Sequence, residues 1–250
     1  MNLQLRSKKF LINKGLTGVL GLLSHPLDCL NYGGKVFWSR RVIRELPEVS
    51  EVNGLKIDCA SYTAFEVPNQ VTSWDIMLYD LFWLVQLLKS VRPKRILEFG
   101  TFTGLTTLYL AKYSDGDAIV TTLDLPDDLF SRIRPSPSID VGMRFRDTPY
   151  AAKIRRIPVD LRALDVSGLG KHDFIFVDAM HYYEDVKRDT ENAFKLLDGE
   201  GLIVWHDYNV NESDAGVVRF LNQLNRSLRD IVHIRGTNLA LYRRRACRRP

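Results

Sequence analysis

The sequence has few cysteines, and they do not form a recognisable set. Cys29, Cys59 and Cys247 are the three cysteines in 250 residues. Their separations do not match those of zinc ligands, and an odd number of cysteines does not suggest a disulfide framework. This usage favours a reducing compartment, so we expect a cytoplasmic protein.

The sequence also lacks an uninterrupted apolar run long enough to cross a membrane. The most apolar stretch, residues 10–30, is broken by Asn13, Lys14, His25 and Asp28. A membrane span needs about 20 consecutive apolar residues. The same polar residues argue against a signal peptide. We therefore expect no membrane span.

A strong charge of one sign is absent from the body of the chain. Lysine and arginine number 35 against 30 acidic residues, which gives a net charge of +5. Part of this excess comes from a cluster near the end of the sequence, namely Arg243, Arg244, Arg245, Arg248 and Arg249. Such a basic tail is usually solvated, and we do not expect nucleic acid as a partner.

The pattern of apolar residues predicts a doubly wound, Rossmann-like α/β fold with a mostly parallel sheet of seven strands. Strands are expected at 95–99, 118–123, 153–158, 173–177, 201–205, 231–234 and 239–242, the last two as an antiparallel C-terminal hairpin. Helices are expected at 74–90, 105–112, 182–197 and 217–228. The proline-containing stretch 125–150 is expected to hold a long loop or short helices.

This pattern divides the chain into three parts. Residues 1–65 are expected to form a helical and irregular N-terminal extension that acts as a cap or an oligomer contact, such as that of a homodimer. Residues 66–243 are expected to form the α/β domain, and residues 244–250 the basic tail.

The first predicted strand runs into a turn that carries Glu98, Gly100 and Gly104. A ligand binds at such a place in a doubly wound sheet. Gly100 would allow close approach of the backbone, and Gly104 would allow tight helix packing or an anion at the helix start. The turn lacks the G-x-G-x-x-G dinucleotide pattern. Since a carboxylate repels a pyrophosphate but tolerates a sulfonium, the turn favours S-adenosylmethionine (SAM) over NAD.

Two further acids follow the next two strands. Asp124 is placed where a carboxylate can bind both hydroxyls of a ribose, and Asp160 where one can bind an adenine amino group. An isolated aspartate after a strand is more often a turn residue or a helix cap. Acids at three successive strand ends, with Glu98 as the first, make the ligand interpretation stronger.

In these motifs the sequence resembles the class I SAM-dependent methyltransferases. The E-x-G-x-x-x-G turn, Asp124 and the strand ending at Asp178 occur in the family's order. The segments VDAMHYYEDV (177–186) and LIVWHDY (202–208) look like those of small-molecule O-methyltransferases of the natural-product and macrolide-sugar type. The resemblance implies that SAM is bound by Glu98, Gly100, Thr101, Gly104, Asp124, Asp160 and Asp178.

A second set of residues is expected to carry the reaction. Asp178 and Asp207 end strands that are neighbours in this topology, about 4.8 Å apart, and could share a Mg²⁺ ion that binds an acceptor hydroxyl. His181 follows Asp178 by one turn and could act as general base. The resemblance supports this role, although a histidine at a helix start is more often a local hydrogen-bonding residue.

One departure from the family concerns the metal. Metal-dependent relatives usually place another acid or amide directly after the second aspartate, whereas this chain has Tyr208. Asn209 could substitute, or the third ligand could come from elsewhere. His206 is given no chemical role, because it could face the opposite side of the strand end. Gln70 and Thr72 are expected to cover the cofactor.

The main hypothesis is methyl transfer from SAM to a hydroxyl of a small-molecule acceptor. Two alternatives stay open, an RNA methyltransferase suggested by the basic tail and an inactive SAM-binding scaffold. Acceptor specificity is expected in residues 1–70 and 125–150, which carry no transferable motif.

Overall fold

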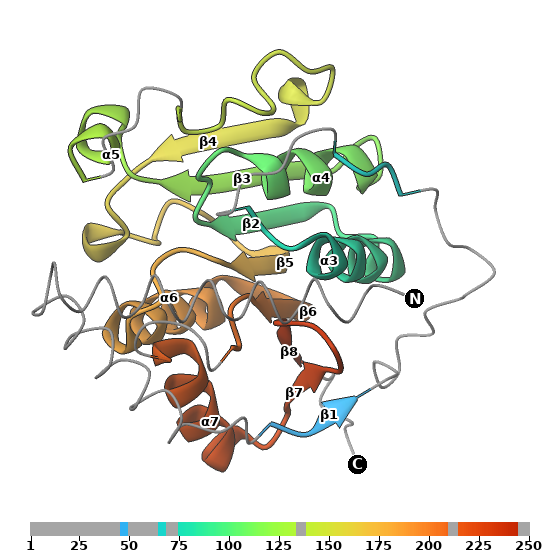
Figure 1. The fold of residues 1–250 in the computed structure, drawn as a ribbon, viewed down its shortest axis with the longest axis vertical. Helices are drawn as coiled ribbons and strands as arrows, with labels where there is room; N and C mark the ends of the chain where they lie inside the picture. The colour runs from blue at the N-terminus through green and yellow to red at the C-terminus, as the bar shows by residue number, and fades with distance from the viewer. Residues whose placement is uncertain (1–45, 50–64, 69–74, 134–138, 210–214, 245–250) are drawn as a thin grey trace, which may run out of the picture.

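The computed structural model describes residues 46–49, 65–68, 75–133, 139–209 and 215–244. An eight-stranded sheet with the order β1-β7-β8-β6-β5-β2-β3-β4 forms its centre (Figure 1). The strands of the parallel part are β2 (Arg95–Phe99), β3 (Ile119–Asp124), β4 (Ile154–Pro158), β5 (His172–Val177) and β6 (Leu197–Trp205). β7 (Ile231–Ile234) and β8 (Ala240–Arg243) form the antiparallel end. The predicted doubly wound fold is confirmed.

The sheet contains one short strand that the sequence analysis missed. β1 (Glu48–Val49) pairs in parallel with β7 at the edge of the sheet. Two residues are too few to show a period of alternating polarity, so no strand could be predicted there. The sheet thus begins inside the segment assigned to the N-terminal extension. The other parts of this segment, residues 1–45 and 50–64, lie outside the described residues.

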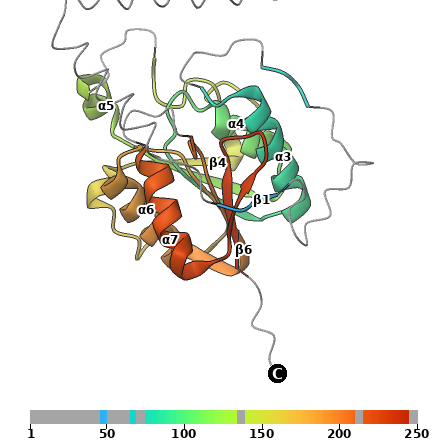
Figure 2. The same cartoon turned by 60° about the horizontal axis from the view of Figure 1, so that its bottom comes forward.

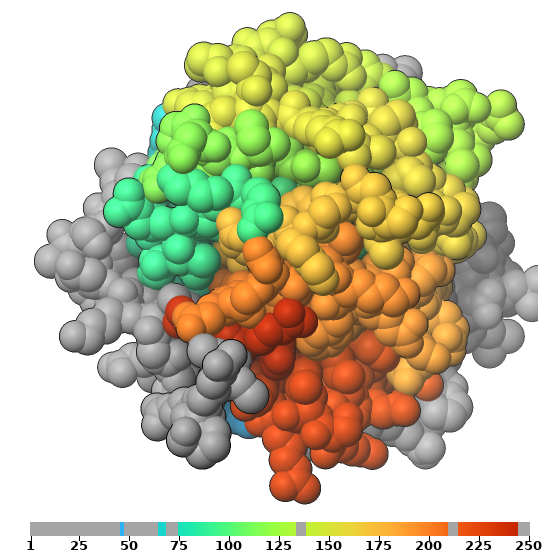
Figure 3. Space-filling view, turned by 180° about the vertical axis from the view of Figure 1, so that it is seen from behind, coloured from blue at the N-terminus to red at the C-terminus, as the bar shows by residue number. Residues whose placement is uncertain are grey.

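Helices cover both faces of the sheet. α3 (Leu78–Val91) and α4 (Leu105–Tyr113) pack on one face, whereas α6 (Tyr183–Leu196) and α7 (Gly216–Leu228) pack on the other (Figure 2). Seen from behind, the region of β4 and the region of α7 again mark opposite ends of the molecule (Figure 3). Alternate residues of each buried strand enter the two cores. In β2, for example, Ile96 packs with α3 and α4, and Leu97 packs on the side of α6 and α7.

The long segment between β3 and β4 holds a short helix, α5 (Asp127–Ile133), and a 3₁₀ turn, η2 (Ala151–Lys153). A second 3₁₀ turn, η3 (Leu161–Ala163), follows β4. These elements agree with the loop and short helices expected for 125–150. Gaps at 134–138 and 210–214 are outside the described residues.

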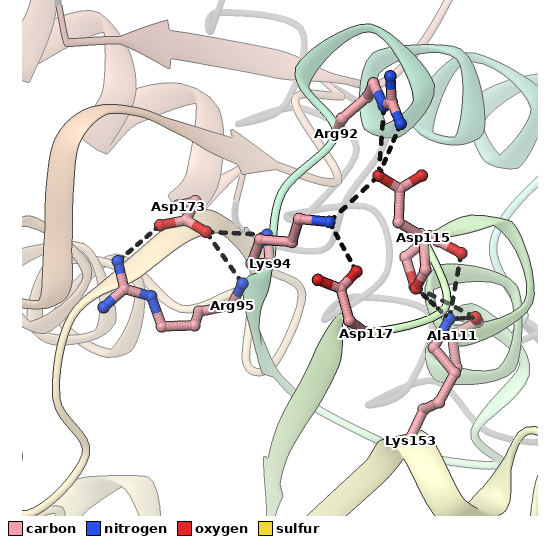
Figure 4. A network of polar contacts seen from close by, with 9 residues as sticks. Arg92, Lys94, Arg95, Ala111, Asp115, Asp117, Lys153 and Asp173 are labelled. Atoms are coloured by element: carbon pink, nitrogen blue, oxygen red, sulfur yellow. Dashed lines mark hydrogen bonds and ion pairs between the residues drawn. The ribbon is translucent and has the colours of Figure 1, made fainter.

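A network of charged side chains holds the amino ends of the strands together, on the edge opposite the glycine turn (Figure 4). Asp173 at the start of β5 accepts hydrogen bonds from the backbone N–H groups of Lys94 and Arg95, at 2.9 and 3.0 Å. The Lys153 ammonium donates to the carbonyl of Ala111, in the last turn of α4, and to that of Asp115, just beyond the helix. A cation is favourable there because a helix carries partial negative charge at its carboxyl end.

Candidate active site

A cavity of about 790 Å³ opens at the carboxyl ends of the parallel strands. This volume is within the range of about 300–1,000 Å³ that is usual for small-molecule sites. Its lining brings together most of the predicted site residues, namely Gly100, Thr101, Asp124, Asp160, Asp178, His181 and Asp207. Glu98 and Gly104 belong to the same turn but lie behind the described residues that line the cavity.

Gly100 follows β2 at a point where the backbone of the next strand passes very close. Its φ is +95°, and a Cβ atom there would lie 2.1 Å from the carbonyl oxygen of Asp178. No L-residue could occupy this position without moving the chain. The glycine therefore lets the turn cross the end of β5, which sets the position of Asp178 relative to the cofactor turn.

Asp124 holds that turn from the end of β3. Its Oδ2 accepts hydrogen bonds from the backbone N–H groups of Thr101 and Phe102, at 2.9 and 2.7 Å. Its Oδ1 accepts from the N–H of Leu125 at 2.7 Å. A carboxylate oxygen can accept two hydrogen bonds, so Oδ1 keeps one acceptor position for a ligand hydroxyl. Asp124 thus fits the ribose role predicted for it and also fixes the shape of the turn.

Glu98 lies fully buried beneath the turn. Its Oε2 accepts hydrogen bonds from the hydroxyls of Thr107 and Thr122, the latter at 2.6 Å. Its Oε1 has no hydrogen-bond partner among the described residues. Burial raises the pKa of Glu98 to about 8, against the two threonine hydrogen bonds that lower it. A buried carboxyl oxygen below the cavity is consistent with a cationic or hydrogen-bonding ligand above it.

Gly104 begins α4 with φ +84° and serves packing. A Cβ atom at this position would lie 2.6 Å from the ring of Phe145 and 2.9 Å from Gly142. The loop that carries Phe145 is also joined to the turn by hydrogen bonds from the N–H of Gly142 to Phe102 O and of Arg144 to Thr103 O. Of the two roles weighed for Gly104, the structure therefore supports tight packing.

Asp160 follows β4, lines the cavity and also caps η3. Its Oδ1 accepts a hydrogen bond from the N–H of Arg162 at 2.9 Å. The turn-capping role and a contact with a ligand are therefore compatible at this position, since the second carboxylate oxygen is not used by the cap.

Asp178, His181 and Asp207 converge at the ends of β5 and β6. His181 Nε2 is 2.9 Å from Asp207 Oδ2, and one ligand atom from each of the three residues lies within 4.8 Å of the others. Burial raises the pKa of Asp178. For Asp207 burial acts in the same direction, but His206 and His181 hold its pKa well below the usual value. The three residues could hold a metal ion.

His206 is the residue that the sequence analysis missed. Its Nδ1 is 3.3 Å from Asp178 Oδ1 and 3.2 Å from Asp207 Oδ2, and its Nε2 is 3.1 Å from Asp80 Oδ2. The expectation that it faces away from Asp207 is wrong because Asp207 has φ +55°. Strand alternation fails at this bend, so consecutive side chains enter the same cavity. Burial would lower the pKa of His206, but Asp178 and Asp207 raise it well above the usual value.

Tyr208 does not approach the metal position. It is fully buried, its hydroxyl accepts a hydrogen bond from the N–H of Leu46 at 3.0 Å, and it donates to Asn222 Oδ1 at 2.6 Å. Tyr208 therefore anchors the segment that leads into β1. Asn209, named above as a substitute ligand, does line the cavity.

The rim of the cavity contains exposed apolar side chains, those of Met77, Ile133, Met180 and Tyr182. Asp75, on the same rim, is bound by Arg144 at 3.0 Å and by the hydroxyl of Thr103 at 2.8 Å. Gln70 and Thr72, predicted to cover the cofactor, lie outside the described residues.

Comparison with known families agrees with this geometry. Residues 97–208, which run from β2 to the turn after β6, match the family model described as a methyltransferase domain. This match agrees with the predicted methyltransferase class.

Solved structures of methyltransferases share the fold. The O-methyltransferase TomG from Streptomyces achromogenes, in complex with SAM, is 20% identical, with a TM-score of 0.53 over 70% of this chain and 83% of that chain. Cofactor-bound Rv0187 from MTB is 18% identical, with a TM-score of 0.51 over 91% of this chain and 96% of that chain.

A curated relative, the uncharacterized protein y4gI of Sinorhizobium fredii, is 26% identical over 74% of this chain. The chain spans about a fifth of the length of this relative, since the match covers 20% of it. In the part of the chain that the structure describes, no helix is long and apolar enough to cross a membrane.

Proposed function

We propose that this methyltransferase transfers a methyl group from SAM to a hydroxyl of a small-molecule acceptor and releases S-adenosylhomocysteine. The observation that carries the proposal is the shared cavity, in which the glycine turn and Asp124 adjoin Asp178, His181 and Asp207. The residues to which we assign SAM binding therefore adjoin the residue that we assign as proton acceptor. The structurally similar TomG is described as an O-methyltransferase and was solved in complex with SAM, which supports the choice of a hydroxyl acceptor.

The residues of the turn fit SAM in size and charge. The cavity is lined by the carboxylates of Asp124, Asp160 and Asp178. Such a surface suits a ligand with a sulfonium and an ammonium group better than one with a pyrophosphate. When bound, SAM supplies an electrophilic methyl group on a sulfur that leaves with the bonding electron pair.

His181 is the residue we assign as general base. Its Nε2 lies 2.9 Å from Asp207 Oδ2, so the carboxylate fixes the ring and stabilises its protonated form. Nδ1 is then the atom that takes the proton from the acceptor hydroxyl as the oxygen bonds to the methyl carbon. The lowered pKa of Asp207 keeps this carboxylate ionised at neutral pH. Its orienting role therefore does not depend on pH near 7.

Asp178 and Asp207 fit a divalent cation such as Mg²⁺, because carboxylate oxygens from two adjacent strands face one another. A cation held there would lower the pKa of an acceptor hydroxyl. From the cysteine content we also propose a cytoplasmic location, and from the apolar content of residues 1–65 a homodimer contact in that extension.

The test is formation of S-adenosylhomocysteine, measured by mass spectrometry, from SAM and a panel of phenols, catechols and sugar hydroxyls. We expect His181→Asn to lower kcat about 10²-fold or more with little change in SAM affinity. Asp117→Asn, at the opposite edge of the sheet, serves as the control and should retain activity. SAM binding without product formation from any acceptor would favour the inactive scaffold and overturn the proposal.

A further inference from the structure

We infer that His206 is the third protein ligand of a divalent metal ion held by Asp178 and Asp207, and that the site prefers a transition-metal ion such as Mn²⁺ to Mg²⁺. This inference rests on the proposed function, since it names the metal site that would serve the methyl transfer. It also supplies the ligand that Tyr208 cannot provide.

His206 Nδ1 lies at the distance of a neighbouring ligand from both carboxylates. His206 Nδ1 is 3.3 Å from Asp178 Oδ1 and 3.2 Å from Asp207 Oδ2. Adjacent ligands of an octahedral ion with bonds of about 2.1 Å are about 3 Å apart. A proton on Nδ1 would donate to the same two carboxylates, so a proton and a metal ion compete for one place.

The far side of the imidazole has the contacts of a metal-bound histidine. Its Nε2 is 3.1 Å from Asp80 Oδ2. Asp80, on α3, is itself fixed by Asn238, whose backbone N–H donates to Oδ1 at 3.0 Å and whose amide donates to Oδ2 at 3.1 Å. A ligating histidine usually donates its second N–H to a carboxylate, which sets its tautomer and orientation. Asp80 supplies this partner for His206, with Nδ1 directed at Asp178 and Asp207.

His181 is the competing candidate for a nitrogen ligand, because its Nε2 is also close to Asp207. Its side chain is 36% exposed, against 9% for His206. We therefore keep His181 as the base and assign the metal to His206.

The donor set determines which ion is preferred. Mg²⁺ favours oxygen ligands, whereas an imidazole nitrogen beside two carboxylates suits Mn²⁺, Fe²⁺ or Co²⁺ better. The wild-type protein should thus bind Mn²⁺ tighter than Mg²⁺ by about tenfold or more. His206→Asn places an amide oxygen near the position of Nδ1, and should reduce this ratio while an oxygen-only site remains.

Pulsed EPR of Mn²⁺ added to the purified full chain tests the inference directly. We expect hyperfine coupling to a directly bound nitrogen in wild type and in His181→Gln, and loss of that coupling in His206→Asn. Asp80→Asn should keep the nitrogen coupling but bind Mn²⁺ more weakly, because the ring is no longer held. Nitrogen coupling that disappears in His181→Gln and persists in His206→Asn would overturn the assignment.

Other results would also overturn it. These are Mn²⁺ binding without nitrogen coupling, no Mn²⁺ binding at millimolar concentration, or Mg²⁺ bound as tightly as Mn²⁺. SAM binding to the same samples, measured by calorimetry, shows that each variant is folded. It also separates the two proposals, because SAM binding and turnover with no metal bound would reject the metal site and leave the methyltransferase activity standing.

Discussion

Replacing Gly100 by alanine should strongly destabilise the protein, because the added methyl group has no space. The new Cβ would lie 2.1 Å from the carbonyl oxygen of Asp178, and the residue would keep a φ of +95°. Overpacking costs about 1–3 kcal/mol, and a left-handed conformation about 1–2 kcal/mol for an L-residue. The free energy of unfolding should therefore fall by about 2–5 kcal/mol, a large part of the usual total of about 5–15 kcal/mol.

Urea unfolding followed by circular dichroism measures this loss, and Gly116→Ala provides a matched control. Gly116 lies in a turn where an added Cβ would have no neighbour within 4 Å, and its φ is not left-handed. Its replacement should be neutral or stabilising by up to about 1 kcal/mol. Equal stabilities for the Gly100→Ala and Gly116→Ala variants would refute the argument that the turn is fixed by its contact with Asp178.

Three further variants test single contacts. Asp124→Ala should weaken SAM binding about 10- to 100-fold in calorimetry, as expected for loss of a hydrogen bond to a charged group; unchanged affinity would remove Asp124 from the cofactor site. Burial raises the pKa of Glu98 to about 8 in the folded protein, against 4.5 in the unfolded chain. Between these pH values the folded protein therefore keeps a proton on Glu98 that the unfolded chain has released. Wild-type stability should fall by up to about 1.4 kcal/mol per pH unit between these values, and Glu98→Gln should remove this dependence in urea unfolding at pH 5, 6.5 and 8. A slope that persists in the variant would assign it to other groups. Tyr208→Phe should lower stability by about 1–2 kcal/mol, because the hydroxyl's hydrogen bonds with Leu46 and Asn222 are lost. Mn²⁺ affinity should be unchanged, and a loss of Mn²⁺ affinity would make Tyr208 part of the metal site after all.

Much of the fold could be predicted because parallel strands are buried on both faces. β2, β5 and the second half of β6, Leu202–Trp205, are near-continuous apolar runs, and each is followed by a polar residue or a turn that marks its end. The first half of β6 is polar, and the sequence did not predict it as strand. The acids at those ends had to share one edge of the sheet, so the meeting of Asp124, Asp178 and Asp207 in one cavity followed from topology. β1 could not be predicted in the same way, since two residues have no detectable period.

The details of the site depended on backbone geometry that sequence patterns do not encode. His206 precedes Asp207 directly, and in an extended strand the two would point to opposite faces. The left-handed φ of Asp207 cancels that alternation. Aspartate tolerates this conformation better than most residues, but its occurrence at this place is set by tertiary packing. The partner of His206, Asp80, lies 126 residues away in the sequence, so no local signal joined them.

Gly104 shows the same limit for a motif residue. Its place in the E-x-G-x-x-x-G turn allowed either a ligand contact or close packing, and the sequence could not decide between them. The contact with Phe145 comes from a loop 41 residues later, whose approach to the turn depends on the hydrogen bond from Gly142 N–H to Phe102 O.

Calorimetric titration of the purified protein with SAM is the measurement that bears most directly on the central claim. We predict micromolar binding of SAM and of S-adenosylhomocysteine, and none of NAD under the same conditions, because the carboxylates around the glycine turn repel a pyrophosphate. Absence of SAM binding, or binding of NAD with equal affinity, would contradict the assignment of this cavity to the methyl donor.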